Sequence, residues 1–193
     1  MTIAPAQLET DTDAFARVVS QRTKAIRTRA AQATIVAGLT WLATHDVLVA
    51  AWLAAALLAR AFEEVVATRL PSRLGWPPAV PWIEAAQAAT TISFVAIAAV
   101  LLRRPDPSRL AEAAILLCAT ALGSAMQTAG SRLAAATLVG PTSLMLIAAP
   151  LWVGLAGHGL APGDTVLLAL SGVIFITFIV RLAATLQAES QAI

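Results

Sequence analysis

An apolar run over residues 30–59 is the feature that most restricts how this 193-residue chain can fold. At about 30 residues it is too long for one membrane span, which needs about 20 residues. His45 and Asp46 stand in its middle, and a charged group at the centre of a bilayer is costly. We therefore expect residues 45 and 46 to form a tight external turn between two short spans, 29–44 and 47–68. Binding of a proton or a metal ion by this pair is the alternative interpretation.

The composition of the whole chain also indicates a protein embedded in lipid. Hydrophobic residues make up 59% of the sequence and charged residues only 12%, whereas soluble domains have about 25% charged residues. The formal net charge of +2 gives no reason to expect a nucleic-acid partner. The single cysteine, Cys118, excludes a disulfide within the chain, and we expect neither a metal site nor a cofactor.

Four further apolar segments follow the first two, so the sequence predicts an all-α, polytopic membrane bundle with about six transmembrane helices. These segments are 82–102, 110–128, 133–155 and 165–181. We divide the chain into a cytoplasmic N-terminal segment, a six-span membrane domain and the start of a cytoplasmic exit helix, at residues 1–28, 29–183 and 182–193. Both termini are then cytoplasmic.

The N-terminal segment is expected to be disordered over residues 1–9 and helical from Thr10. Phe15, Val18 and Val19 form a short apolar stripe on this helix, beside several basic residues. The helix either lies on anionic lipid headgroups or is solvated and only fixes the topology. Further along, residues 69–81 contain four prolines and one glycine, which predicts a rigid loop.

The spacing of small residues and prolines makes predictions about the later spans. Ala119 and Gly123 form a small-xxx-small pair that permits close approach of another helix. Pro141 and Pro150 are expected to kink the fifth span. Trp41 and Trp52 are expected near the external interface, where indole rings are favoured.

The distribution of basic residues favours six spans over five, the number that results if 30–59 is a single span. With six spans, ten of the 13 basic residues lie on the cytoplasmic side, against eight with five spans, and positive residues favour that side. Arg103, Arg104 and Arg109 remain on the external side in the six-span arrangement. They are exceptions to the positive-inside rule.

Few residues in this sequence carry recognisable chemistry. It contains no HExxH, phosphate-binding glycine loop or GxSxG motif, so no catalytic residue is assigned. Candidate polar residues within the membrane or for signalling are Glu84, Gln87 and Gln127. Reaching the headgroups is the simpler role for Glu84. Candidate cytoplasmic contact residues are Arg60, Glu63 and Glu64, although Arg60 is also spaced to pair with either carboxylate along one helix.

The layout of the chain resembles the six-span N-terminal membrane domains of bacterial sensor histidine kinases and diguanylate cyclases. The resemblance covers roughly residues 17–193. It rests on the basic lead-in, the tight first hairpin, the span-two exit WLAAALLARAFEEVVATRL, the proline-broken fifth span VGPTSLMLIAAPLWVGL and the exit helix RLAATLQAESQAI.

This resemblance implies a sensory or anchoring domain in the bacterial inner membrane. Such a domain acts as a homodimer and relays a signal through its last helix to a cytoplasmic kinase or cyclase module outside this chain. Any enzymatic activity would belong to that module. A small transporter or permease subunit and a membrane assembly or scaffold protein are the alternative functions.

The topology is testable by cysteine accessibility at positions 46, 75 and 106. We expect Gly75→Cys to react with a reagent applied from the cytoplasmic side, and Asp46→Cys and Asp106→Cys to react from the external side. Labelling of position 106 only from the cytoplasmic side would contradict the six-span arrangement.

Overall fold

The computed structural model describes residues 5–103, 107–127, 132–155 and 161–191, and every element in these ranges is a helix. In chain order the helices are α1 (Pro5–Lys24), α2 (Ile26–Thr44), α3 (Leu48–Leu74), α4 (Trp76–Val95), α5 (Ile97–Leu101), α6 (Pro107–Gln127), α7 (Arg132–Leu155) and α8 (Pro162–Gln191). The prediction of an all-α bundle is therefore confirmed for the described part of the chain.

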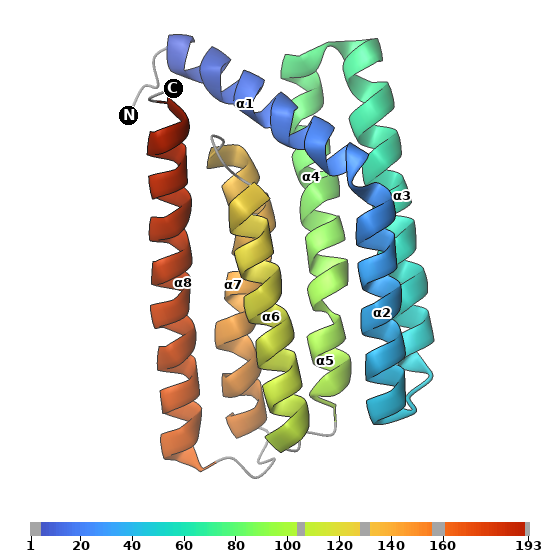
Figure 1. Cartoon of the computed structure of the whole chain (residues 1–193), viewed down its shortest axis with the longest axis vertical. Coiled ribbons are helices and arrows are strands. Elements are labelled where there is room, and N and C mark those ends of the chain that lie inside the picture. The colour runs from blue at the N-terminus through green and yellow to red at the C-terminus, as the bar shows by residue number, and fades with distance from the viewer. Residues whose placement is uncertain (1–4, 104–106, 128–131, 156–160, 192–193) are drawn as a thin grey trace.

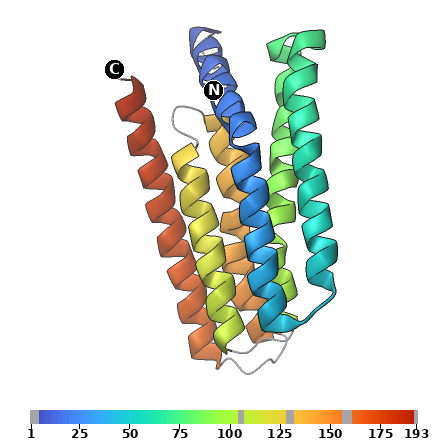
Figure 2. The same ribbon diagram turned by 45° about the vertical axis from the view of Figure 1, so that its right-hand side comes forward.

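Helices α2 to α8 run side by side along one axis, with α4 and α5 forming a single pass, and α1 lies across one end (Figure 1). Both termini lie at that end, which we call the termini end. The turn between α2 and α3 lies at the opposite end, and the view turned by 45° shows the same arrangement (Figure 2).

Four of these passes are long and apolar enough to cross a membrane. They are 76–101, 108–126, 137–155 and 162–182. Helix α2 is not among these four because its apolar part begins only after Arg29. Helix α3 is not among them because the charged residues Arg60, Glu63 and Glu64 interrupt its apolar sequence. The structure is therefore compatible with a multi-pass membrane protein, and the first two spans, 29–44 and 47–68, remain predictions.

Large apolar side chains cover the outer surface of these passes. On α8, Leu167, Ile174 and Phe178 are 63%, 70% and 58% exposed. Soluble monomers rarely expose a continuous apolar surface of this extent, whereas a membrane helix presents such side chains to lipid. The outer face of α8 is therefore suited to a hydrocarbon environment.

Helix α4 is the central element of the bundle. It packs against α3 on one side and α7 on the other. One hydrophobic cluster joins α4 and α5 to α6 and α7, and a second joins α2 and α3 to α5. The bundle thus has two groups of helices, α2–α3 and α6–α8, with α4 and α5 between them.

The N-terminal helix does not behave as either sequence interpretation expected. It begins at Pro5, so the prediction of disorder is wrong for residues 5–9. Phe15, Val18 and Val19 are almost completely buried, in a cluster with residues of α3, α4 and α7. Burial of this apolar stripe against the bundle, rather than against lipid or water, fixes α1 across the termini end.

The prediction of a loop over residues 69–81 is wrong, because helices occupy nearly all of this stretch. Helix α3 continues to Leu74, α4 begins at Trp76, and Gly75 with φ 81° joins them. Pro77 and Pro78 fall in the first turn of α4, where backbone N–H groups have no helical acceptor and proline is tolerated. Because prolines are tolerated in the first helical turn, a single residue, Gly75, is enough to connect α3 and α4.

Trp52 points into the bundle and not toward the surroundings, and it is 5% exposed. Its Nε1 donates a hydrogen bond to the Ser93 carbonyl at 2.7 Å, and its ring lies 5.9 Å from that of Phe94. Ser93 stands just before α4 gives way to α5. The indole therefore links α3 to this interruption in the central pass.

Helices α7 and α8 approach each other closely at Gly172. A Cβ atom at this position would lie 3.1 Å from the Leu146 carbonyl oxygen of α7. Helix α7 itself is continuous through Pro141 and Pro150. The absence of a side chain at Gly172 thus lets α8 pack directly on the α7 backbone.

We expect Gly172→Leu to lower the free energy of unfolding in mixed micelles by about 1–3 kcal/mol, because the new side chain must push α8 away from α7. Gly38→Leu is the matched control. Gly38 also lies away from the ends of its helix, but it is exposed and a Cβ atom there would meet nothing within 4 Å. Equal stability of the two variants would contradict this account of the α7–α8 contact.

Candidate functional site

A buried ion pair joins α1 to α3 near the termini end. Arg22 Nε donates to Glu63 Oε1 at 2.7 Å, and Arg22 Nη2 donates to Glu63 Oε2 at 3.1 Å. This is the bidentate geometry in which guanidinium and carboxylate bind most strongly. The side chains are only 7% and 11% exposed. The sequence interpretation placed Arg60 beside Glu63, but the partner of the carboxylate comes from α1.

Two further arginines adjoin this pair and make, with Arg22, what we call the arginine cluster. Arg29 of α2 is 9% exposed. The guanidinium carbon of Arg60 on α3 lies 5.8 Å from the centre of the Phe94 ring of α4, in cation–π contact. All three arginines, together with Glu63, border one small gap between the helices. Four helices therefore contribute to the site.

Arg60 has unused hydrogen-bonding capacity. Its Nε atom is buried, and no group in the described part of the chain accepts a hydrogen bond from it. A buried charged donor without an acceptor is costly, and the contact with Phe94 compensates the charge only in part. Arg60 is therefore the residue of the cluster best suited to receive an anion.

The arginine cluster borders the end of a groove with a volume of about 630 Å³. Helices α2 and α6 form its walls, and α4 with α5 forms its floor. The lining residues are Arg22, Arg29, Gln32, Val36, Leu39, Thr40, Arg60, Thr90, Thr91, Phe94, Leu101, Glu112, Ile115, Leu116, Ala119, Thr120, Gly123 and Ser124. Between the arginines and Glu112, most of these side chains are apolar or small.

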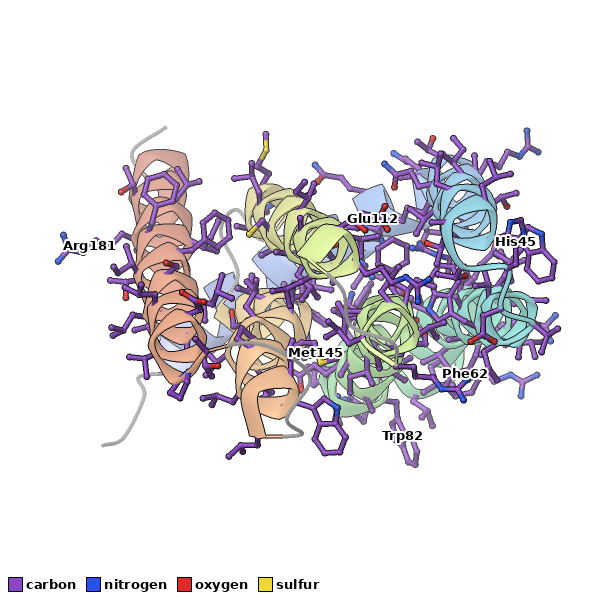
Figure 3. All side chains as sticks on the ribbon, turned by 90° about the horizontal axis from the view of Figure 1, so that it is seen from below. His45, Phe62, Trp82, Glu112, Met145 and Arg181 are labelled. Carbon is purple, nitrogen blue, oxygen red and sulfur yellow. The ribbon has the colours of Figure 1, made fainter. Side chains whose placement is uncertain are left out.

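The groove extends over much of the bundle's length. Its lining residues on α6 run from Glu112 to Ser124, which corresponds to about 18 Å at 1.5 Å per residue. Viewed from the end opposite the termini, Glu112 lies between α6 and α2 (Figure 3). Leu39 and Ile115 are more than 60% exposed, so the apolar part of the groove opens sideways between α2 and α6.

The predicted approach of a helix to Ala119 and Gly123 is not observed. Both residues line the groove, and a Cβ atom at Gly123 would meet nothing within 4 Å. The small side chains on this face of α6 therefore widen the groove instead of permitting helix contact. Sequence alone does not distinguish these two uses of small residues, because both require the same spacing.

Two of the predicted polar membrane residues, Glu84 and Gln87, do not line the groove. Gln87 is 1% exposed and accepts a hydrogen bond from Thr137 of α7 at 3.4 Å. Its Nε2 has no acceptor among the described residues. Glu84 is half-buried one turn earlier on α4. The side chain of Gln127 lies outside the described residues.

The predicted cytoplasmic contact residues separate into two environments. Arg60 borders the groove and Glu63 is buried against Arg22, whereas Glu64, the next residue, is exposed. Glu64 alone of the two carboxylates faces the surroundings. Arg29 and Phe94, which sequence reasoning missed, complete the site. The only feature of the sequence that could have indicated this part of the site is Arg29 itself, a charged residue at the edge of the apolar run 30–59.

The structure places His45 and Asp46 in the turn between α2 and α3. His45 has φ 50°, in the left-handed region, and its N–H donates to the Trp41 carbonyl. Asp46 accepts a hydrogen bond from the Leu48 N–H at 2.9 Å and forms an ion pair with Arg103 at 3.2 Å. This ion pair stabilises Arg103 at the end of the bundle opposite the termini.

No family model, curated protein or solved structure matches this chain. The resemblance to sensor-kinase membrane domains therefore rests on sequence layout alone. Among the residues that the structure describes, no group of three His, Cys, Asp or Glu side chains is placed to hold a metal ion. The arginine-bordered groove is the candidate site on which a function can be argued.

We expect Glu63→Gln to lower the free energy of unfolding in mixed micelles by about 3 kcal/mol, because it leaves buried arginines without their counterion. Glu64→Gln is the control. It neutralises the adjacent, exposed carboxylate and should change stability by less than about 0.5 kcal/mol. Similar losses in the two variants would show that the Arg22–Glu63 pair does not hold α1 in place.

Proposed function

We propose that this chain is a membrane-embedded sensory domain of a bacterial signal-transduction protein. The observation that carries the proposal is the groove of about 630 Å³ between α2, α4 and α6, bordered by buried arginines. Its volume lies within the range of ligand sites, about 300–1,000 Å³. Ionisable residues within a membrane bundle are costly and commonly mark functional sites.

The position of the groove suits a change in helix packing as the response. Its two walls belong to different groups of helices, because α2 packs mainly on α3 while α6 packs mainly on α7. An occupant that contacts both walls favours one spacing between the groups over another. A ligand shifts such an equilibrium only by its difference in affinity for the two packings.

Helix α8 is the element through which the change would leave the bundle. It packs on α7 and α6 and continues to Gln191, past the end of its apolar part at residue 182. A continuous helix transmits a shift or rotation at one end to the other. We propose that the termini end is cytoplasmic, that the chain makes six spans in the inner membrane, and that two copies associate to drive a kinase or cyclase module.

Transport is the second candidate, favoured by the interruption between α4 and α5 in the floor of the groove. Discontinuous helices form substrate sites in several transporters. A transporter would move its ligand between the two sides of a proteoliposome. A sensory domain would bind the ligand without net flux.

Fusing a histidine-kinase core after Ile193 tests the sensory function. We expect Gly123→Leu, which fills the groove, to change autophosphorylation at least about threefold, because it alters the spacing of α2 and α6. Gly38→Leu, at an exposed position on α2 outside the groove, should leave kinase output unchanged. Equal output from the parent and both variants would reduce the domain to an anchor.

A further inference from the structure

We infer that the groove binds a single-chain amphiphile with a phosphate monoester headgroup, with the phosphate on the arginine cluster and the chain between α2 and α6. This inference rests on the proposed function of the groove as a ligand site and names the chemistry of the ligand.

The charge of the cluster matches this headgroup. Among the described residues that border the small gap, three guanidinium groups face one buried carboxylate, that of Glu63, and one exposed carboxylate, that of Glu64. Glu64 is exposed and solvated, and Glu112 lies toward the other end of the groove. A phosphate monoester carries about −1.5 to −2 charges at neutral pH. It would neutralise the cluster more completely than a monoanionic carboxylate.

Arg60 provides the specific contact. Its buried Nε lacks an acceptor among the described residues, and the residue lines the groove. Guanidinium groups bind phosphate oxygens through paired, charge-assisted hydrogen bonds. A phosphate placed here would satisfy the unused donor and leave the cation–π contact with Phe94 intact.

The remainder of the groove fits one hydrocarbon chain. Val36, Leu39, Ile115 and Leu116 supply apolar walls, the small residues Ala119 and Gly123 also line the groove, and a Cβ atom at Gly123 would meet nothing within 4 Å. The sideways opening between Leu39 and Ile115 would admit a chain from surrounding lipid. A volume of about 630 Å³ suits a single chain better than the two chains of an ordinary phospholipid.

Native mass spectrometry of the full chain in a neutral maltoside detergent tests this inference with three probes. Oleoyl lysophosphatidic acid carries both the phosphate and the chain, glycerol phosphate the headgroup alone, and monoolein the chain with a neutral head. We expect saturable binding of one oleoyl lysophosphatidic acid per chain, at least about tenfold tighter than either other probe, because only this probe engages both parts of the site.

Two variants and two matched controls locate the binding. Arg60→Gln removes the proposed phosphate contact, and Gly123→Leu fills part of the groove without removing a charge. Each should weaken binding of oleoyl lysophosphatidic acid at least about tenfold. Arg69→Gln, an exposed arginine on the same helix, and Gly38→Leu should leave its affinity unchanged.

Three outcomes would overturn the inference. Glycerol phosphate binding as tightly as oleoyl lysophosphatidic acid would indicate a site for a free anion. Equal binding of monoolein would indicate a site that recognises only the chain. Unchanged affinity in both Arg60→Gln and Gly123→Leu would indicate non-specific association with the lipid-facing surface. If any of these occurs while Gly123→Leu still changes kinase output, the ligand class is wrong and the sensory function stands.

Discussion

The arrangement at the termini end depends on the ion pair that the carboxylate of Glu63 forms with Arg22. The carboxylate binds Arg22 in bidentate geometry and lies beside Arg29 and Arg60, and of these four side chains those of Glu63, Arg22 and Arg29 are buried. Buried charges are tolerated only when compensated. Glu63 thereby links α1 to α3, while the apolar stripe of α1 packs on α3, α4 and α7. One ion pair and one apolar cluster together close this end of the bundle.

The groove follows from how the remaining helices divide their contacts. Helix α2 packs on α3, α6 packs on α7, and α4 contacts both α3 and α7. Small residues on the facing side of α6 then leave space that no side chain of α2 fills. The positive charge at one end and the apolar walls beyond it give the groove two chemically different parts. That combination, more than its volume, suits an amphiphilic ligand.

Parts of this arrangement follow directly from local sequence, and others depend on distant residues. The turn at residues 45 and 46 was predictable, because a charged residue interrupts an apolar run that is too long for one span. The partner of Asp46 was not, since Arg103 lies 57 residues away. The proline-rich stretch 69–81 misled the prediction because prolines in a first helical turn and prolines in a loop look alike in sequence.

The helical class, the apolar passes and the number of chain reversals follow from the amino-acid sequence, because hydrophobic content and span length are local properties. Which charged residues meet depends on the fold. Arg22 and Glu63 are 41 residues apart, and nothing in their spacing distinguishes an internal pair from two solvated side chains. The same holds for Ala119 and Gly123, whose small size permits either a helix contact or a cavity. Burial of charge and the filling of space depend on neighbours that are distant in the chain, so the candidate site became visible only in the folded molecule.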